Sequence, residues 1–284
     1  MKKIYTYIAT LVMTACAFNS MAQLDVIDVK EAAKLMTNDN VLIISARTPA
    51  DYEKVHIPGA VNINHKDLYG EKSMLLPANE LASFLGQKGI DNNKTLLIYD
   101  DGSGKYAGRL YWIFDYLGVN DIKVIDGGMK AWRMGRKPVT KNPTTIAAVN
   151  FTAKPNADLI ATMAEVKAAV NNANHIIIDA RSADEFNGVA TTTLRTGHIP
   201  SAINLEFTQV MDENGLLKSA DALTALFNEK GITKNKSIIV YCESSVRAGI
   251  IYLSLRGLGY PKVAVYDGAY LEWQSVTSNA VAMN

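Results

Sequence analysis

The second half of this chain repeats the first, and this repeat constrains the possible folds more than any other feature of the sequence. Four segments return in the same order about 140 residues later, a spacing too long for a solenoid and typical of a duplicated domain. The paired segments are Leu42–Tyr52 and Ile176–Phe186, His56–Ile63 and His198–Leu205, Leu97–Asp100 and Ile239–Cys242, and Leu117–Gly128 and Leu258–Ala269. Each copy closes on a tryptophan, Trp132 or Trp273. The chain is therefore predicted to form two similar domains.

Short apolar runs alternate with helical stretches within each copy. In the first copy, the predicted strands are Val41–Ile44, Val61–Ile63, Leu96–Tyr99 and Lys123–Ile125, and the predicted helices include Asn79–Gln87 and Ala107–Leu117. Strands that alternate with helices form right-handed crossovers and a mainly parallel sheet. We therefore expect an α/β protein with two tandem domains, each a mainly parallel sheet covered by helices on both faces.

The boundary between the two domains is predicted where prolines gather. Pro138, Pro143 and Pro155 lie among threonines and asparagines, a composition typical of an irregular connection. The expected division is a first domain over residues 24–140, a linker over 141–156 and a second domain over 157–284.

Residues 1–22 have the pattern of a secretory signal peptide. Two lysines follow Met1, an uncharged and mostly apolar run follows them, and Ser20-Met21-Ala22 offers small residues before a cleavage point. The apolar run is too short for a membrane span. We therefore expect export, to the periplasm, with anchoring by a lipid on Cys16 as the alternative.

The charge balance excludes one class of partner. The 29 basic and 28 acidic residues leave a formal net charge of +1, without a block of like charge. Such a surface does not favour nucleic acid, and the short apolar N-terminus does not predict an integral membrane protein.

Removal of residues 1–22 would leave Cys242 as the only cysteine, at the end of the apolar run Ile238–Tyr241. This run predicts a buried parallel strand, and the small and apolar residues from Ala248 predict a helix. Open α/β sheets bind ligands at the carboxyl ends of their strands. Backbone N–H groups at a helix N-terminus also favour a thiolate over a thiol. Cys242 is therefore a candidate nucleophile, and the alternative is a packing role.

These motifs resemble the rhodanese family, in particular its tandem-domain sulfurtransferases. Three elements carry the resemblance: Asp179–Phe186 followed by Gly197–Ala202, the loop Cys242–Arg247, and the ending Asp267–Trp273. The resemblance implies that Cys242 becomes a persulfide, that the first copy is inactive, and that neither a metal nor an organic cofactor takes part. In the first copy Asp100 stands at the position of Cys242, in a loop one residue longer.

The resemblance also implies a small anionic sulfur donor, with thiosulfate favoured and 3-mercaptopyruvate as the alternative, and a thiol or cyanide-like acceptor. Backbone N–H groups from Glu243 to Ala248 would form an anion-binding nest for the sulfur. The candidate substrate-binding residues are Arg247, Arg195, Ser244, Ser245 and Glu243, and Asp179 and Arg181 are expected to support the site from behind. Arg247 could instead pair with a carboxylate such as Glu185 or Asp179.

His198 is not expected to act as a base for Cys242. The first copy has the same histidine, His56, beside a site without a cysteine. A turn and packing role is the simpler interpretation for both.

Two further function classes compete with a sulfurtransferase. A cysteine-dependent phosphatase would need a loop one residue longer, because its nest must hold a tetrahedral phosphoryl group, whereas four residues separate Cys242 from Arg247. A periplasmic persulfide carrier or redox-binding module without efficient turnover would need the same cysteine and nest as an enzyme, so the sequence leaves it open.

Overall fold

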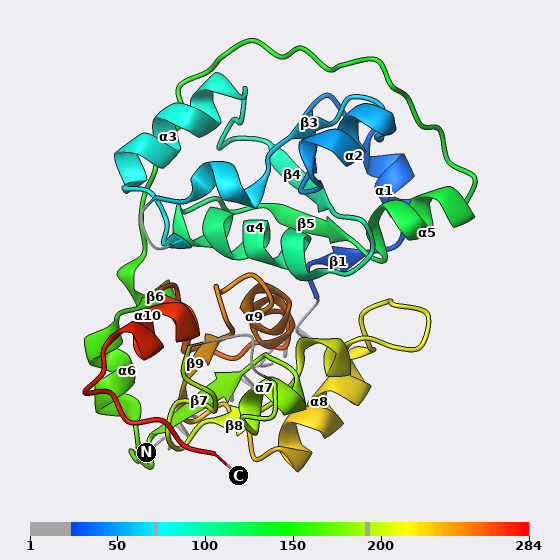
Figure 1. The fold of residues 1–284 in the computed structure, drawn as a ribbon. Helices are drawn as coiled ribbons and strands as arrows, with labels where there is room; N and C mark the ends of the chain where they lie inside the picture. Colours follow the sequence, from blue (N-terminus) through cyan, green and yellow to red (C-terminus); the bar gives the residue numbers. More distant parts are fainter. Residues whose placement is uncertain (1–23, 71–72, 191–193, 284) are drawn as a thin grey trace, which may run out of the picture.

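The structure is a computed structural model that describes residues 24–70, 73–190 and 194–283. It contains two α/β units, stacked one above the other in Figure 1. The predicted signal peptide and Cys16 lie outside the described residues.

The first unit begins at β1 (Val26–Ile27) and ends with α5 (Gly128–Met134). Between them lie α1 (Val29–Leu35), β2 (Val41–Ser45), α2 (Pro49–Lys54), β3 (Val61–Asn62), η1 (His65–Leu68), α3 (Ala78–Gln87), β4 (Thr95–Tyr99), α4 (Lys105–Tyr116) and β5 (Ile122–Ile125). The strands and helices predicted here from the sequence are all present, with ends shifted by one or two residues.

The second unit begins with an additional 3-10 helix, η3, and then has the same order of elements. They are η3 (Ala157–Leu159), β6 (Ile160–Ala161), α6 (Met163–Ala169), β7 (His175–Asp179), α7 (Ala183–Phe186), β8 (Ile203–Asn204), η4 (Phe207–Val210), α8 (Ala220–Glu229), β9 (Ser237–Tyr241), α9 (Ala248–Gly257), β10 (Val263–Tyr266) and α10 (Ala269–Ser275).

Each unit has one five-stranded sheet, and the two sheets have equivalent strand orders, β1-β5-β4-β2-β3 and β6-β10-β9-β7-β8. Every neighbouring pair of strands is parallel. Strand side chains alternate between two apolar cores. In β2, for example, Leu42 and Ile44 join one core and Ile43 joins the other. The predicted fold class is therefore confirmed.

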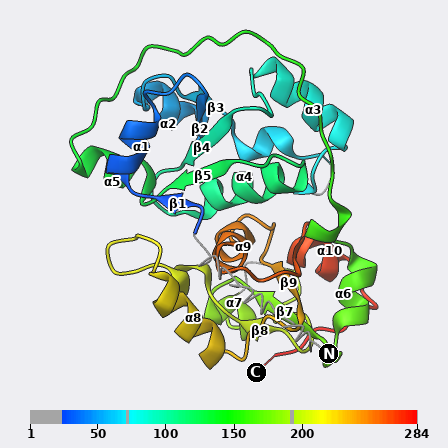
Figure 2. The same ribbon diagram turned by 180° about the vertical axis from the view of Figure 1, so that it is seen from behind.

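The two units meet through α4 and α9, which face each other across the middle of the molecule in Figures 1 and 2. Two glycines allow the close approach. A Cβ on Gly108 would lie 2.6 Å from the Ile250 nitrogen, and a Cβ on Gly249 would lie 2.3 Å from the Arg109 nitrogen. Apolar side chains of both units therefore form one continuous core across this contact.

The predicted linker, residues 141–156, contains no helix or strand in the structure. It arches around the outside of the first unit before it enters the second (Figure 1). Backbone hydrogen bonds attach it along the way, from the Val149 N–H to the Gly86 carbonyl (3.0 Å) and from the Lys154 N–H to the Leu117 carbonyl (2.9 Å). No helix in the described part of the chain is long and apolar enough to cross a membrane.

Candidate active site

Cys242 directly follows β9, at the carboxyl edge of the second sheet, as its sequence position predicts. The residue is buried, with 1% of its surface exposed. Its carbonyl accepts a hydrogen bond from the Tyr270 N–H (3.0 Å), and the Glu243 carbonyl accepts one from the Leu271 N–H (3.1 Å). These two bonds fasten the cysteine to the start of α10 and fix its backbone position.

Residues 243–247 curl between β9 and α9, and Ser245 has a positive φ of 56°. A left-handed residue in such a curl turns successive N–H groups toward one concave side. Within the described chain, none of the backbone N–H groups of residues 243–247 donates to a protein acceptor. The loop therefore has donors available for an anion beside Cys242.

The first unit shows what this type of loop can hold. Asp100 follows β4 as Cys242 follows β9, and its buried carboxylate accepts hydrogen bonds from N–H groups of the following loop and of the first turn of α4. The donors are Gly102 (2.8 Å), Gly104 (3.2 Å), Tyr106 (3.2 Å) and Ala107 (3.4 Å). Burial raises the pKa of Asp100, and the backbone donors oppose this shift. The same architecture that surrounds Cys242 thus encloses an acidic group in the duplicate.

Arg247 forms a bidentate ion pair with Glu185. Its Nη1 lies 2.6 Å from Oε2 and its Nη2 lies 2.8 Å from Oε1. Burial raises the pKa of Glu185, but the hydrogen bonds from Arg247 and Ser182 outweigh it and lower the pKa to about 2. The alternative that the sequence left open for Arg247, a structural pair with Glu185, is therefore present.

Arg247 also interacts electrostatically with Cys242. Burial lowers its pKa, but Glu185, Cys242 and Glu243 together raise the pKa above the ordinary value, so the guanidinium stays charged. Its Nη2 lies 3.7 Å from Oε2 of Glu243, whose side chain is 34% exposed. A substrate anion would share Arg247 with these two carboxylates.

The two loop serines lie in different surroundings. Ser245 is fully buried, and its hydroxyl lies 3.0 Å from the carbonyl oxygen and 3.2 Å from Oδ1 of Asp267. Ser244 is half-buried. Of the two predicted substrate contacts, Ser244 has the more accessible position, whereas the Ser245 hydroxyl has Asp267 as a partner.

Arg195 reaches the C-terminal segment. Its Nη1 donates to the Val276 carbonyl (3.1 Å) and its Nη2 donates to the Asn279 carbonyl (2.7 Å). Arg195 therefore ties the residues after α10 to the segment before His198, and its predicted substrate contact stays a prediction.

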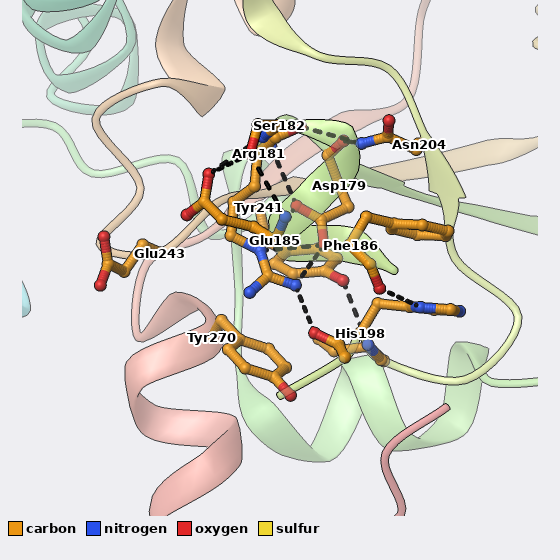
Figure 3. A network of polar contacts seen from close by, with 12 residues as sticks. Asp179, Arg181, Ser182, Glu185, Phe186, His198, Asn204, Tyr241, Glu243 and Tyr270 are labelled. Atoms are coloured by element: carbon orange, nitrogen blue, oxygen red, sulfur yellow. Dashed lines mark hydrogen bonds and ion pairs between the residues drawn. The ribbon is translucent and has the colours of Figure 1, made fainter. Parts of the chain in front are cut away.

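Asp179 and Arg181 form a buried ion pair (Figure 3). Arg181 Nη2 lies 2.6 Å from Asp179 Oδ2 and 2.8 Å from the Gly197 carbonyl, and its guanidinium stacks 3.9 Å from the centre of the Tyr270 ring. The backbone N–H of Tyr270 also donates to the Cys242 carbonyl. The Asp179–Arg181 pair therefore helps to hold the backbone of Cys242 in position.

The two repeat histidines have matching contacts. His198 stacks on Phe186 at 3.6 Å, with Nδ1 2.8 Å from the Phe186 carbonyl. His56 stacks on Tyr52 at 3.9 Å, with Nδ1 2.8 Å from the Tyr52 carbonyl. Both histidines therefore pack against the helix that precedes them, as predicted.

Arg109, Asp267 and Tyr69 lie near the Cys242 loop, and the sequence reasoning missed all three as site residues. Arg109 Nη2 forms a buried ion pair of 2.7 Å with Oδ1 of Asp267, the same oxygen that Ser245 contacts. A signal was present in the repeat, because Arg109 interrupts an apolar helix at the position where the second copy has Ile250. Among the described residues, no group of three or more histidine, cysteine or acidic side chains could hold a metal ion.

The fold and this loop define a class of protein: a duplicated α/β domain that keeps one cysteine at the end of a parallel strand. The model of the rhodanese-like domain matches residues 28–134 and 162–276. The chain therefore belongs to the rhodanese family.

Relatives of known name cover most of the chain. It is 32% identical over 244 residues to a putative thiosulfate sulfurtransferase of Mycobacterium bovis, which covers 82% of this chain and 87% of the relative. It is 32% identical over 258 residues to the 3-mercaptopyruvate sulfurtransferase of Escherichia coli, covering 88% and 89%. The crystal structure of the 3-mercaptopyruvate sulfotransferase SseA from Escherichia coli superposes with a TM-score of 0.80 and 31% identity, over 87% of this chain and 99% of that one.

Proposed function

We propose that this protein is a sulfurtransferase, which moves a sulfane sulfur from a small anionic donor to a thiol or cyanide-like acceptor through a persulfide on Cys242. The observation that carries the proposal is the placement of Cys242 beside loop N–H groups that have no acceptor among the described residues. Relatives at about this identity are named thiosulfate and 3-mercaptopyruvate sulfurtransferases. No metal or organic cofactor is needed for this chemistry.

The reaction has two displacements at sulfur. The Cys242 thiolate attacks the outer sulfur of the donor, a new S–S bond forms, and the old bond to that sulfur breaks with its electron pair on the leaving group. The acceptor then attacks the outer sulfur of the persulfide and releases the Cys242 thiolate. The protein-bound charge is on the Cys242 thiolate before the first displacement and on the terminal sulfur of the persulfide after it, and the N–H groups of residues 243–247 lie where they can stabilise both.

Thiosulfate is the favoured donor. Its leaving group is sulfite, which departs as a stable anion and needs no proton. When 3-mercaptopyruvate is the donor, the leaving group is the enolate of pyruvate. This enolate must then be protonated on carbon. Arg247 offsets the charge of Glu243 for either donor, because its Nη2 lies 3.7 Å from the Glu243 carboxylate.

The experiment is a single-turnover loading assay on the intact protein, followed by mass spectrometry. With thiosulfate we expect the mass to rise by one sulfur atom at Cys242, and cyanide should then remove that atom as thiocyanate. Cys242→Ser should stay unloaded. The absence of a sulfur adduct with either donor would refute the proposal, and loading without transfer to any acceptor would indicate a persulfide carrier instead.

A second donor is supported by the relative from Escherichia coli, which is named a 3-mercaptopyruvate sulfurtransferase. The same assay separates the two donors. Efficient loading by 3-mercaptopyruvate alone would reassign the substrate while the persulfide mechanism stands.

A phosphatase function has less support. Four residues separate Cys242 from Arg247, and both Nη atoms of that arginine bind Glu185. Hydrolysis of an aryl phosphate that Cys242→Ser abolishes would overturn this conclusion.

We further propose that residues 1–22 direct export to the periplasm, with a lipid on Cys16 as the alternative. The support is the charged start, the short apolar run and the small residues before position 23. The test is the intact mass of the protein purified from the periplasmic fraction of a host. Cleavage after Ala22 supports export, and an uncleaved chain contradicts it.

A further inference from the structure

Arg109 belongs to the unit that has no cysteine, yet it lies at the loop that has one. The crossing of α4 and α9 explains this placement. The helices approach most closely at Gly108 and Gly249, so the residue after each glycine lies against the loop of the opposite unit. Ile250, the residue after Gly249, lies against the Asp100 loop of the first unit. Its Cδ1 would lie 3.0 Å from a Cβ on Gly104 in that loop.

The two sides of this crossing have different chemistry. On the side of Asp100, a small space of about 10 Å³ is lined mainly by apolar residues, among them Met211, Leu217 and Ile250. On the side of Cys242, Arg109 occupies the position that corresponds to Ile250. Arg109 thus places a buried cation on the side that has the nucleophile.

Asp267 fixes Arg109 in this position. The Asp267 carboxylate accepts hydrogen bonds from Arg109 Nη2 (2.7 Å), from the Leu75 N–H (2.7 Å) and from the Ser245 hydroxyl (3.2 Å). Ser245 belongs to the loop that begins at Cys242. One carboxylate therefore joins the first unit, the guanidinium and the cysteine loop.

The Arg109 guanidinium has N–H donors that make no hydrogen bond within the described chain. Arg109 is fully buried, and within the described chain its Nε and Nη1 atoms have no hydrogen-bond partner. Its aromatic neighbours are Trp112 and Tyr69, whose ring centres lie 4.4 Å and 5.2 Å from Cζ. Buried donors without acceptors are costly and rare, so their presence at an active site indicates a group that binds there during the reaction.

The electrostatics agree with this geometry. Burial lowers the pKa of Arg109, but Tyr69, Asp267 and Cys242 outweigh it and raise the pKa above the ordinary value. The guanidinium is therefore charged at any pH at which the enzyme folds. Burial raises the pKa of Tyr69, the charge of Arg109 opposes this shift, and Asp267 and Cys242 add to it.

We propose that Arg109, which belongs to the unit without a cysteine, is a further group that stabilises negative charge on the sulfur of Cys242, beside the N–H groups of residues 243–247. The ligand class is a sulfur anion, either the thiolate of Cys242 or the terminal sulfur of its persulfide. The role of Arg109 in turnover rests on the proposed sulfurtransferase function, whereas its effect on the thiolate does not.

The test measures the rate at which iodoacetamide alkylates Cys242 in the full-length protein as a function of pH, with the modified peptide identified by mass. Replacing Arg109 by glutamine should shift the midpoint of the profile upward by about one unit and slow alkylation at pH 7 about tenfold. Arg109→Lys should restore most of the rate because it keeps the charge. Arg256→Gln is the matched control: Arg256 pairs with Asp115 at 3.5 Å, at the far end of α9, so its profile should match wild type.

A second variant guards against misfolding. Arg109→Gln leaves the Asp267 carboxylate buried without its cation, so the double variant Arg109→Gln/Asp267→Asn removes both charges together. It should keep the raised midpoint. A wild-type alkylation profile in either folded variant would overturn the proposal. This readout needs no sulfur donor, so a failure of the Arg109 proposal is distinguishable from a failure of the proposed function.

Discussion

At the scale of single residues, the site combines one nucleophile with cations that are already paired. Arg247 binds Glu185, Arg109 binds Asp267 and Arg181 binds Asp179. Paired cations keep their geometry before a substrate arrives, which favours a pre-organised anion site. The cost is that the loss of either partner leaves a buried charge uncompensated.

Replacing Arg247 by glutamine tests this cost at Glu185. The pKa of Glu185 is about 2, well below the ordinary 4.5, so the pair stabilises the fold above pH 4.5 and this contribution is lost as the pH falls from 4.5 toward 2. Arg247→Gln should lower the free energy of unfolding at pH 7 by about 3 kcal/mol. Urea unfolding measures the change.

The control is the double variant Arg247→Gln/Glu185→Gln, which removes both charges. It should recover part of the lost stability, because no carboxylate is then buried without its cation. A single variant as stable as wild type at pH 7 would contradict the structural importance of this pair.

At the scale of secondary-structure elements, the contact between α4 and α9 is decisive. It joins the cores of the two units, and it brings Arg109 to the Cys242 loop. The contact depends on two glycines, because a methyl group at either position would meet backbone atoms of the other helix at less than 3 Å.

Gly249→Ala should therefore force the helices apart and destabilise the protein by about 1–3 kcal/mol, the usual range for overpacking. It should also slow sulfur loading at Cys242, since Arg109 moves with α4. Thermal unfolding and the loading assay together report both effects. Gly70→Ala is the control, because a Cβ there meets its nearest neighbour, the Leu76 side chain, at 3.4 Å. Equal stability of the two variants would contradict the close crossing.

At the scale of the whole molecule, the two copies have diverged in their charges while they kept one architecture. Asp126 accepts the Leu217 N–H of the second unit, and Asp267 accepts the Leu75 N–H of the first, so the interface has approximate twofold symmetry. His65 departs from this symmetry. It begins η1, whereas Phe207 begins the equivalent η4.

The structure predicts a pH-dependent stability that originates at His65. Burial lowers its pKa to about 4, and the charges of Arg109, Lys66 and Lys105 add to the shift. The folded protein thus binds this proton less readily than the unfolded chain does. The stability is complete above pH 6.5 and falls by up to about 3 kcal/mol as the pH drops to 4.

His65→Phe introduces the side chain that the second copy has at the equivalent position, Phe207, and it removes the titration of His65. Its free energy of unfolding should change less between pH 7 and pH 4 than that of wild type, in urea titrations at each pH. An identical pH dependence in the two proteins would show that His65 does not carry the effect.

The sequence by itself determined the duplication, the parallel sheets and the position of Cys242 at the end of a strand. These features depend on local patterns, namely alternating strands and helices and an apolar run that stops at a cysteine. The packing roles of His56 and His198 followed from the same repeat. The limits of the elements were also predictable to within one or two residues.

Only the tertiary structure decided which partner each polar side chain of the Cys242 loop has. Whether Arg247 is available to a substrate depends on where Glu185 lies, 62 residues earlier in the chain, and the Ser245 hydroxyl has its partner, Asp267, 22 residues later. Arg109 reaches the loop through a crossing of two helices, and its partner Asp267 is 158 residues away. Such contacts form because glycines let two backbones approach, and no local periodicity encodes which side chains then meet.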